Sequence, residues 1–178
     1  MEMPGGGYWN VYPGQVTDDS ELAMCLMRGL VAGKGKFDLF HHCLYYGYWI
    51  KLQPFDIGRT TMNGLGPLAE CLDNPNPEVA KGAARCARTR TSMSNGSLMR
   101  ITPLAVWARN LQLHGVEQAV VADVSLMHSK CDMWDLITAY CLAIQTLLKN
   151  PENEQRASLA IESVKNYTKR DCISPLVA

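Results

Sequence analysis

The fold class of this chain is decided by the stretch MWDLITAYCLAIQTLL, which occupies residues 133–148. Its apolar side chains recur every three or four positions, a spacing that places them on one face of an α-helix. That face carries Trp134, Ile137, Cys141, Ile144 and Leu148. A strand would instead alternate apolar and polar residues. The stretch therefore predicts a long amphipathic helix whose apolar face is buried.

Helical spacing recurs on both sides of this stretch, and proline or glycine marks several of the breaks. We expect further helices at about residues 19–30, 38–49, 60–72, 77–89, 98–108, 116–127 and 150–168. Asn76 would cap the helix that Pro77 opens, and Pro103 would be tolerated early in its own helix. No segment shows the sustained alternation and β-branched enrichment that predict strands. The chain is therefore predicted to be all-α.

The length and composition are those of one globular domain. With 178 residues the chain can bury a sizeable core, so we predict a single domain over residues 1–178. The 17 Lys and Arg residues equal the 17 Asp and Glu residues. The totals thus give no electrostatic reason to expect a nucleic-acid or membrane partner. No apolar run reaches the length of about 18 residues that a membrane-spanning helix needs.

Seven cysteines are scattered along the chain and never form a C-x-x-C pair. A secreted disulfide framework more often has an even number of cysteines in a shorter chain. We interpret these cysteines as reduced thiols, mostly small residues of the core. The first residues show no basic segment followed by an apolar run, so no signal peptide is expected. Together these features predict a cytoplasmic protein.

The segment Thr17-Asp18-Asp19-Ser20-Glu21 lies at the head of the first predicted helix. Adjacent carboxylates and a hydroxyl are oxygen ligands of the kind that hard divalent cations bind. The same residue types also cap helices, because they satisfy free N–H groups and favour the positive end of the helix dipole. Spacing alone favours the capping interpretation over the metal site. Asp56, which precedes another predicted helix, is also interpreted as a cap.

The loop Ser92–Ser97 consists of small residues and leads into a predicted helix. Backbone N–H groups of such a loop can bind a phosphate, although an ordinary interhelical loop has the same pattern. His128 follows an apolar helix, and Cys131 comes one turn later without the further ligands of a zinc site. His128 is thus either a helix C-terminal residue or a hydrogen-bonding group beside a pocket. His41 and His42 point about 100° apart on a helix, and we interpret them as a surface or interface pair.

Four segments of the chain stand in an order that is typical of one protein family. They are Pro13–Glu21, Pro54–Thr61, Ser94–Leu104 and Ser125–His128. Together they resemble the motifs of the ADP-ribosylglycohydrolase family, over about residues 5–149. The resemblance implies a compact, all-α orthogonal bundle of many helices.

The resemblance also implies a role for each motif. The implied ligands of a two-magnesium centre are Thr17, Asp18 and Asp19. The implied substrate-binding residues, which would hold the diphosphate and ribose of ADP-ribose, are Ser94, Asn95, Gly96, Ser97 and His128. The implied activity is hydrolysis of the glycosidic bond between ADP-ribose and a protein side chain or small acceptor. In it the metals would position the ribose hydroxyls and polarise a water molecule.

Two pieces of the family pattern have no match here: a Gly-Asp-Ala-Leu-Gly segment followed by a glutamate, and a downstream Asp-x-Asp-Thr cluster. Each magnesium ion needs about six oxygen ligands, so the matched residues would leave two ions under-coordinated. One hypothesis is a hydrolase, or part of a longer one, that obtains the missing ligands elsewhere. The alternative is a non-catalytic relative, a pseudoenzyme, acting as a structural or binding module in a larger assembly. A truncated bundle would expose apolar surface, which predicts a protein partner that completes or covers it.

Overall fold

A computed structural model describes residues 3–73, 75–78 and 92–170, and in these residues it contains helices and no strands. The α-helices are α1 (Asp18–Ala32), α2 (Leu39–Lys51), α3 (Arg59–Leu65), α5 (Thr102–Trp107), α6 (Leu113–Val124), α7 (Cys131–Lys149) and α8 (Arg156–Thr168). Two 3₁₀-helices, η1 (Gly66–Leu72) and η2 (Ala108–Asn110), directly continue α3 and α5. The all-α prediction is confirmed.

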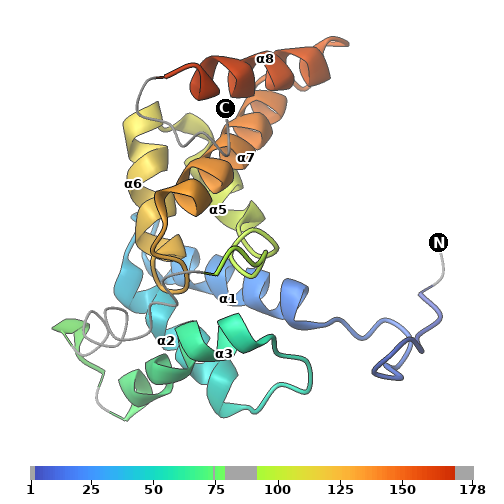
Figure 1. Cartoon of the computed structure of the whole chain (residues 1–178), viewed down its shortest axis with the longest axis vertical. Coiled ribbons are helices and arrows are strands. Elements are labelled where there is room, and N and C mark those ends of the chain that lie inside the picture. Colours follow the sequence, from blue (N-terminus) through green and yellow to red (C-terminus); the bar gives the residue numbers. More distant parts are fainter. Residues whose placement is uncertain (1–2, 74, 79–91, 171–178) are drawn as a thin grey trace.

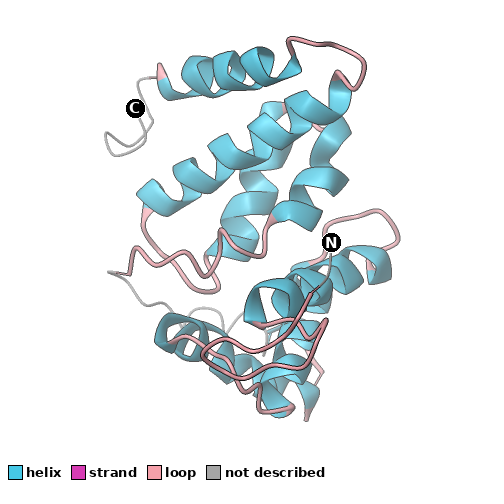
Figure 2. Cartoon of the chain, turned by 90° about the vertical axis from the view of Figure 1, so that its right-hand side faces the viewer, coloured by secondary structure: helices cyan, strands magenta, loops and turns pink. Residues whose placement is uncertain are grey.

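The helices form two groups that pack on one another (Figure 1). One group consists of α1, α2, α3 and η1, and the other consists of α5, α6, α7 and α8. Figure 2, turned by 90°, shows the same two groups. They meet where α1 contacts α5 and α2 contacts α6. The segment before α1 extends away from both groups.

One core of apolar side chains continues through both groups. Its fully buried members include Leu22, Leu26, Tyr46, Leu104, Val120 and Ile137. The apolar face of α7 reaches this core through Ile137 and Cys141, as the spacing predicts. Leu148, at the C-terminal end of the same face, is 42% exposed. The predicted face is thus buried in the middle of α7 and exposed at its end.

Two helices begin later than the sequence spacing predicts, and both differences involve proline. Residues 95–100 form turns, and α5 begins only at Thr102. Pro103 is then the second helical residue, where its missing N–H leaves no intrahelical bond unmade. α8 begins at Arg156, after turns that include Pro151.

Two polar side chains act as N-caps, and of these Asn76 was the one expected. Asp38 is the N-cap residue of α2, and its Oδ1 accepts the Phe40 N–H at 3.0 Å. Asn76 Oδ1 accepts the Glu78 N–H at 2.9 Å, as a cap before Pro77 should. The remainder of the helix predicted at 77–89 lies outside the described residues.

The structure also tests the predictions about buried cysteines and about membrane-spanning helices. Cys25, Cys43 and Cys141 are buried, in agreement with the interpretation of the cysteines as core residues, whereas Cys131 is exposed. Among the described helices, none has both the length and the apolar character needed to cross a bilayer.

Candidate functional site

The first candidate residues lie at the head of α1, where Thr17 occupies the N-cap position. Its hydroxyl makes no capping hydrogen bond and instead donates to Asp19 Oδ2 at 3.4 Å. Asp18 Oδ1 accepts the backbone N–H of Asp19 at 3.0 Å. Thr17 thus occupies the capping position without a side-chain capping bond, and one oxygen of Asp18 accepts an N–H of the first turn. Most side-chain oxygens of this segment are not used to begin the helix.

A third carboxylate, that of Asp56, acts on Asp18 from the segment between α2 and α3. The pKa of Asp18 is raised to about 6, first by partial burial and then by the negative charges of Asp56 and Asp19. Gly58 is the N-cap residue of α3, so the interpretation of Asp56 as a cap is wrong. A cation placed among these carboxylates would relieve their mutual repulsion. In the sequence, Asp56 lies two residues before Gly58, so its carboxylate is not needed to cap α3. That position is the signal that could have identified Asp56 as a site residue.

The side chains at the head of α1 fit magnesium in type, because it prefers oxygen ligands. Their oxygen atoms are too few to coordinate two magnesium ions. In the part of the chain that the structure describes, no three His, Cys, Asp or Glu side chains are grouped as a metal site requires. Thr17, Asp18 and Asp19 therefore supply oxygen atoms of a suitable type, and both cation binding at this segment and the two-magnesium centre stay predictions.

The second candidate is the loop before α5, which is held between the start of α3 and the end of α6. Thr60 Oγ1 and Ser92 Oγ lie 3.0 Å apart and share a hydrogen bond. Gly96 is buried, and a Cβ at this position would lie 2.7 Å from Met127 Cε and 3.1 Å from Thr61 Oγ1. The loop therefore packs closely against both neighbours, and a side chain at position 96 would require Met127 and Thr61 to shift.

His128 lies against this loop, as the resemblance implies. Its Nδ1 is 2.8 Å from Ser97 Oγ and its Nε2 is 3.4 Å from Ser94 Oγ. The side chain of His128 is fully buried, and burial, followed by the positive charge of Arg100, lowers its pKa to about 4. The imidazole is therefore neutral at pH 7. Asn95, the other polar residue of the loop, is exposed.

Behind the loop is a buried cluster of polar side chains that the sequence analysis did not identify. Arg100 Nη2 donates to Asp123 Oδ2 at 2.8 Å, and both side chains are inaccessible to solvent. Tyr46 donates to Asp123 Oδ1 and accepts from Arg100 Nε, both at 2.9 Å. His42 is also fully buried, with Nδ1 3.6 Å from Asp123 Oδ1, so its interpretation as a surface residue is wrong. A charged pair twenty-three residues apart leaves no periodic signal that would have revealed this cluster.

The two candidate regions are joined through residues 56–61. Asp56 interacts electrostatically with Asp18 of α1, and Thr60, four residues later, hydrogen bonds to Ser92 at the start of the loop. Four residues span at most about 14 Å. The chain thus places the head of α1 and the small-residue loop near one another, although about 75 residues separate them in sequence.

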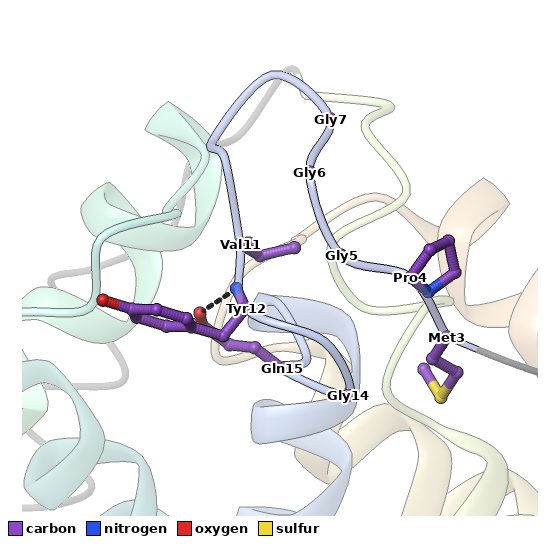
Figure 3. A pocket seen from close by; sticks show the side chains of 9 residues that line it. All are labelled: Met3, Pro4, Gly5, Gly6, Gly7, Val11, Tyr12, Gly14 and Gln15. Atoms are coloured by element: carbon purple, nitrogen blue, oxygen red, sulfur yellow. Dashed lines mark hydrogen bonds between the residues drawn. The ribbon is translucent and has the colours of Figure 1, made fainter.

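A separate pocket of about 360 Å³ lies in the segment before α1 (Figure 3). It is lined by residues 3–7, 11, 12, 14 and 15. Gly6 and Val11 exchange two backbone hydrogen bonds of 2.8 and 3.0 Å, and the Tyr12 N–H donates to Gln15 Oε1 at 2.9 Å. None of the candidate residues lines this pocket. We therefore do not assign the functional site to it.

Comparison with known proteins agrees with the motifs. The sequence matches the ADP-ribosylglycohydrolase family over residues 1–176. It is 31% identical over 105 residues to an ADP-ribosyl-[dinitrogen reductase] glycohydrolase of Rhodospirillum rubrum, covering 59% of this chain and 32% of the relative. It is 26% identical over 175 residues to the ADP-ribosylarginine hydrolase Tri1 of Pseudomonas putida, covering 92% of this chain and 43% of the relative. The chain spans less than half the length of these curated relatives.

The family match extends over nearly the whole chain. Its motifs map to the head of α1, the segment before α3, the loop before α5 and the end of α6. The helical fold, the order of these motifs and the match lead to one assignment. This chain belongs to the ADP-ribosylglycohydrolase family.

Proposed function

We propose that this chain carries the ADP-ribose-binding and part of the magnesium-binding apparatus of an ADP-ribosyl hydrolase. The reaction is hydrolysis of the glycosidic bond between ADP-ribose and a protein side chain or a small acceptor. The observation that carries the proposal is the electrostatic interaction of Asp18 with Asp19 and with Asp56, which lies in the segment that hydrogen bonds to the small-residue loop. Relatives named for the removal of ADP-ribose support the same reaction.

The loop is the proposed binding site for the diphosphate and adjacent ribose. Gly96 allows the backbone to pack closely, while Asn95 is exposed to solvent and to a ligand. His128 is neutral and buried beside Ser94 and Ser97, so it presents no charge of its own to the substrate. Its proposed role is a hydrogen bond to the bound ADP-ribose.

The carboxylates are the proposed site of chemistry. Bound magnesium would supply positive charge that orients the ribose hydroxyls and stabilises developing negative charge. Thr17, Asp18 and Asp19 would hold it from the side of α1. Asp56 is half-buried and does not cap a helix, which suits a carboxylate that accepts the proton of the attacking water. The water oxygen bonds to the anomeric carbon as the bond to the acceptor breaks, and the acceptor gains a proton.

Magnesium titration of the purified chain tests the cation site. We expect saturable binding, followed by calorimetry, that Asp18→Asn and Asp19→Asn each weaken at least tenfold, because each removes a negatively charged ligand. Glu154→Gln also removes an exposed carboxylate, from the turns before α8, and should leave binding unchanged. Identical titrations for the wild-type chain and both α1 variants would disprove the cation site.

A second experiment separates binding from hydrolysis. The wild-type chain is mixed with ADP-ribose to measure affinity and with an ADP-ribosylated arginine substrate to measure release of ADP-ribose, both in the presence of magnesium. Release that Asp56→Asn abolishes supports the hydrolase. Binding of ADP-ribose without any release would instead support the binding module.

A further inference from the structure

The buried cluster behind the loop contains a cation whose hydrogen bonds are directed at the candidate substrate-binding residues. Arg100 Nη1 donates to the Gly96 carbonyl oxygen at 2.8 Å and to Ser97 Oγ at 3.3 Å. The other side of the guanidinium is held by Asp123 and Tyr46. Arg100 therefore connects α2 and α6 to the two residues at the centre of the loop.

The electrostatics of this cluster keep Arg100 and Asp123 charged. Burial alone would raise the pKa of Asp123, but the Arg100 guanidinium, with His42 and Tyr46, lowers it to about 2. Burial would lower the pKa of Arg100, and the charge of Asp123 raises it above its ordinary value. A guanidinium can only donate hydrogen bonds. Each group that faces Arg100 must therefore accept from it.

This constraint favours one direction for the hydrogen bond between Ser97 and His128. The Ser97 oxygen accepts from Arg100 on one side, and its own O–H needs an acceptor on the other side. Nδ1 of His128 lies 2.8 Å away and is able to accept, because the imidazole is neutral. Donation by Ser97 leaves the single imidazole proton on Nε2. That N–H then points toward Ser94, at the less buried part of the loop.

We propose that Arg100 is a positioning residue that sets the conformation of the loop at Gly96 and Ser97 and, through Ser97, holds His128 as the Nε2–H tautomer. The result is a neutral hydrogen-bond donor directed at Ser94, one of the proposed substrate-binding residues. The relay from Arg100 through Ser97 to His128 is a property of the free chain. The role of this relay in substrate binding rests on the proposed function.

The two loop serines form a matched pair of variants. Ser97→Ala removes the donor to Nδ1, so His128 should populate both tautomers, whereas Ser94→Ala should keep the Nε2–H form. Long-range ¹H–¹⁵N correlation spectra of ¹⁵N-histidine-labelled chain report the tautomer directly. The chain has four histidines, so the His128 signals are assigned by their loss in His128→Gln. A wild-type Nδ1–H form, or a Ser97→Ala spectrum identical to wild type, would overturn the relay.

A charge-free pair tests the role of Arg100. Arg100→Met alone would leave Asp123 buried without its partner and is expected to unfold the chain. Arg100→Met combined with Asp123→Leu removes both charges, and circular dichroism verifies that it folds. We expect this double variant to show mixed tautomers and at least tenfold weaker ADP-ribose affinity. A folded double variant that keeps both the wild-type tautomer and affinity would refute the proposal, and if it does not fold, the serine pair decides.

These readouts separate the two claims. If the wild-type chain fails to bind ADP-ribose but shows the Nε2–H tautomer with the expected serine effects, the proposed function fails and the relay stands. If the chain binds ADP-ribose but its His128 tautomer does not respond to Ser97→Ala, the relay fails and the proposed function stands.

Discussion

At the scale of single residues, His128 shows how a charge and a hydrogen bond depend on each other. Burial and the Arg100 guanidinium lower its pKa to about 4, whereas a histidine in an unfolded chain titrates near pH 6.5. Only the neutral imidazole offers Nδ1 as an acceptor to Ser97. Protonation of His128 would therefore remove the acceptor that the Ser97 hydroxyl uses.

This shift has a definite effect on stability. Between about pH 6.5 and pH 4, the unfolded chain binds a proton at His128 that the folded chain does not, so stability falls as the pH falls. The contribution lost between pH 7 and pH 4.5 is about 2 to 3 kcal/mol. Urea unfolding at the two pH values measures it. His128→Gln should reduce the difference between them by that amount, while His114→Gln, at an exposed site, should not. Equal differences for the wild-type chain and His128→Gln would contradict this account.

At the scale of helices, two glycines allow the first group to pack closely. A Cβ on Gly47 of α2 would clash with the backbone of η1, lying 2.8 Å from the Leu68 carbonyl carbon and even closer to its oxygen. A Cβ on Gly29 of α1 would overlap the ring of His42. The packing of α1, α2 and η1 thus depends on missing side chains, which hydrophobic spacing does not register.

Gly47→Ala tests this packing. We expect it to lower the free energy of unfolding by about 2 kcal/mol or more, because backbone atoms of η1 cannot move aside as a flexible side chain does. Gly115→Ala in α6 is the matched control, since its Cβ would meet only Leu111 at an ordinary 3.5 Å. The free energy of unfolding of that control should rise by about 0.5 kcal/mol, because alanine has a higher helix propensity than glycine. If denaturant unfolding gave the same free energy of unfolding for both variants, the close packing of α2 on η1 would be contradicted.

At the scale of the whole molecule, the second helix group exposes apolar side chains on α7 and α8. They include Leu136, Leu147 and Leu148 on α7, and Leu159 and Ile161 on α8. An apolar hollow of about 220 Å³ lies between the two helices, lined in part by Ala143 and Ile161. Neighbouring exposed apolar residues of this kind favour association.

We therefore expect the isolated chain to self-associate. Sedimentation velocity should show an average mass that rises with concentration over the micromolar range. Leu148→Lys combined with Ile161→Lys should shift this rise to at least tenfold higher concentration, because charges in a buried contact are unfavourable. The matched control is Glu154→Lys, which adds a positive charge in the nearby turns without removing an apolar group. A wild-type chain that stays monomeric throughout would rule out an associating surface.

The site was predictable where motifs mark it. The motifs pointed to the segment Thr17–Asp19, the loop Ser94–Ser97 and His128 as site residues. In the structure, His128 contacts Ser94 and Ser97. Asp56 was assigned to the wrong role because an acidic residue before a helix resembles a cap. His42 was placed on the surface because its partner, Asp123, lies on a helix more than 70 residues later.

The sequence by itself determined the helices, because the spacing of apolar residues and the positions of proline and glycine act within a few residues. It also determined the family, because its motifs are local. Only the tertiary structure decided which charges meet: Asp56 with Asp18, and Arg100 with Asp123 and Tyr46. The reason is that electrostatic and hydrogen-bonding partners are chosen by distance in space, which helix packing sets and periodicity does not encode.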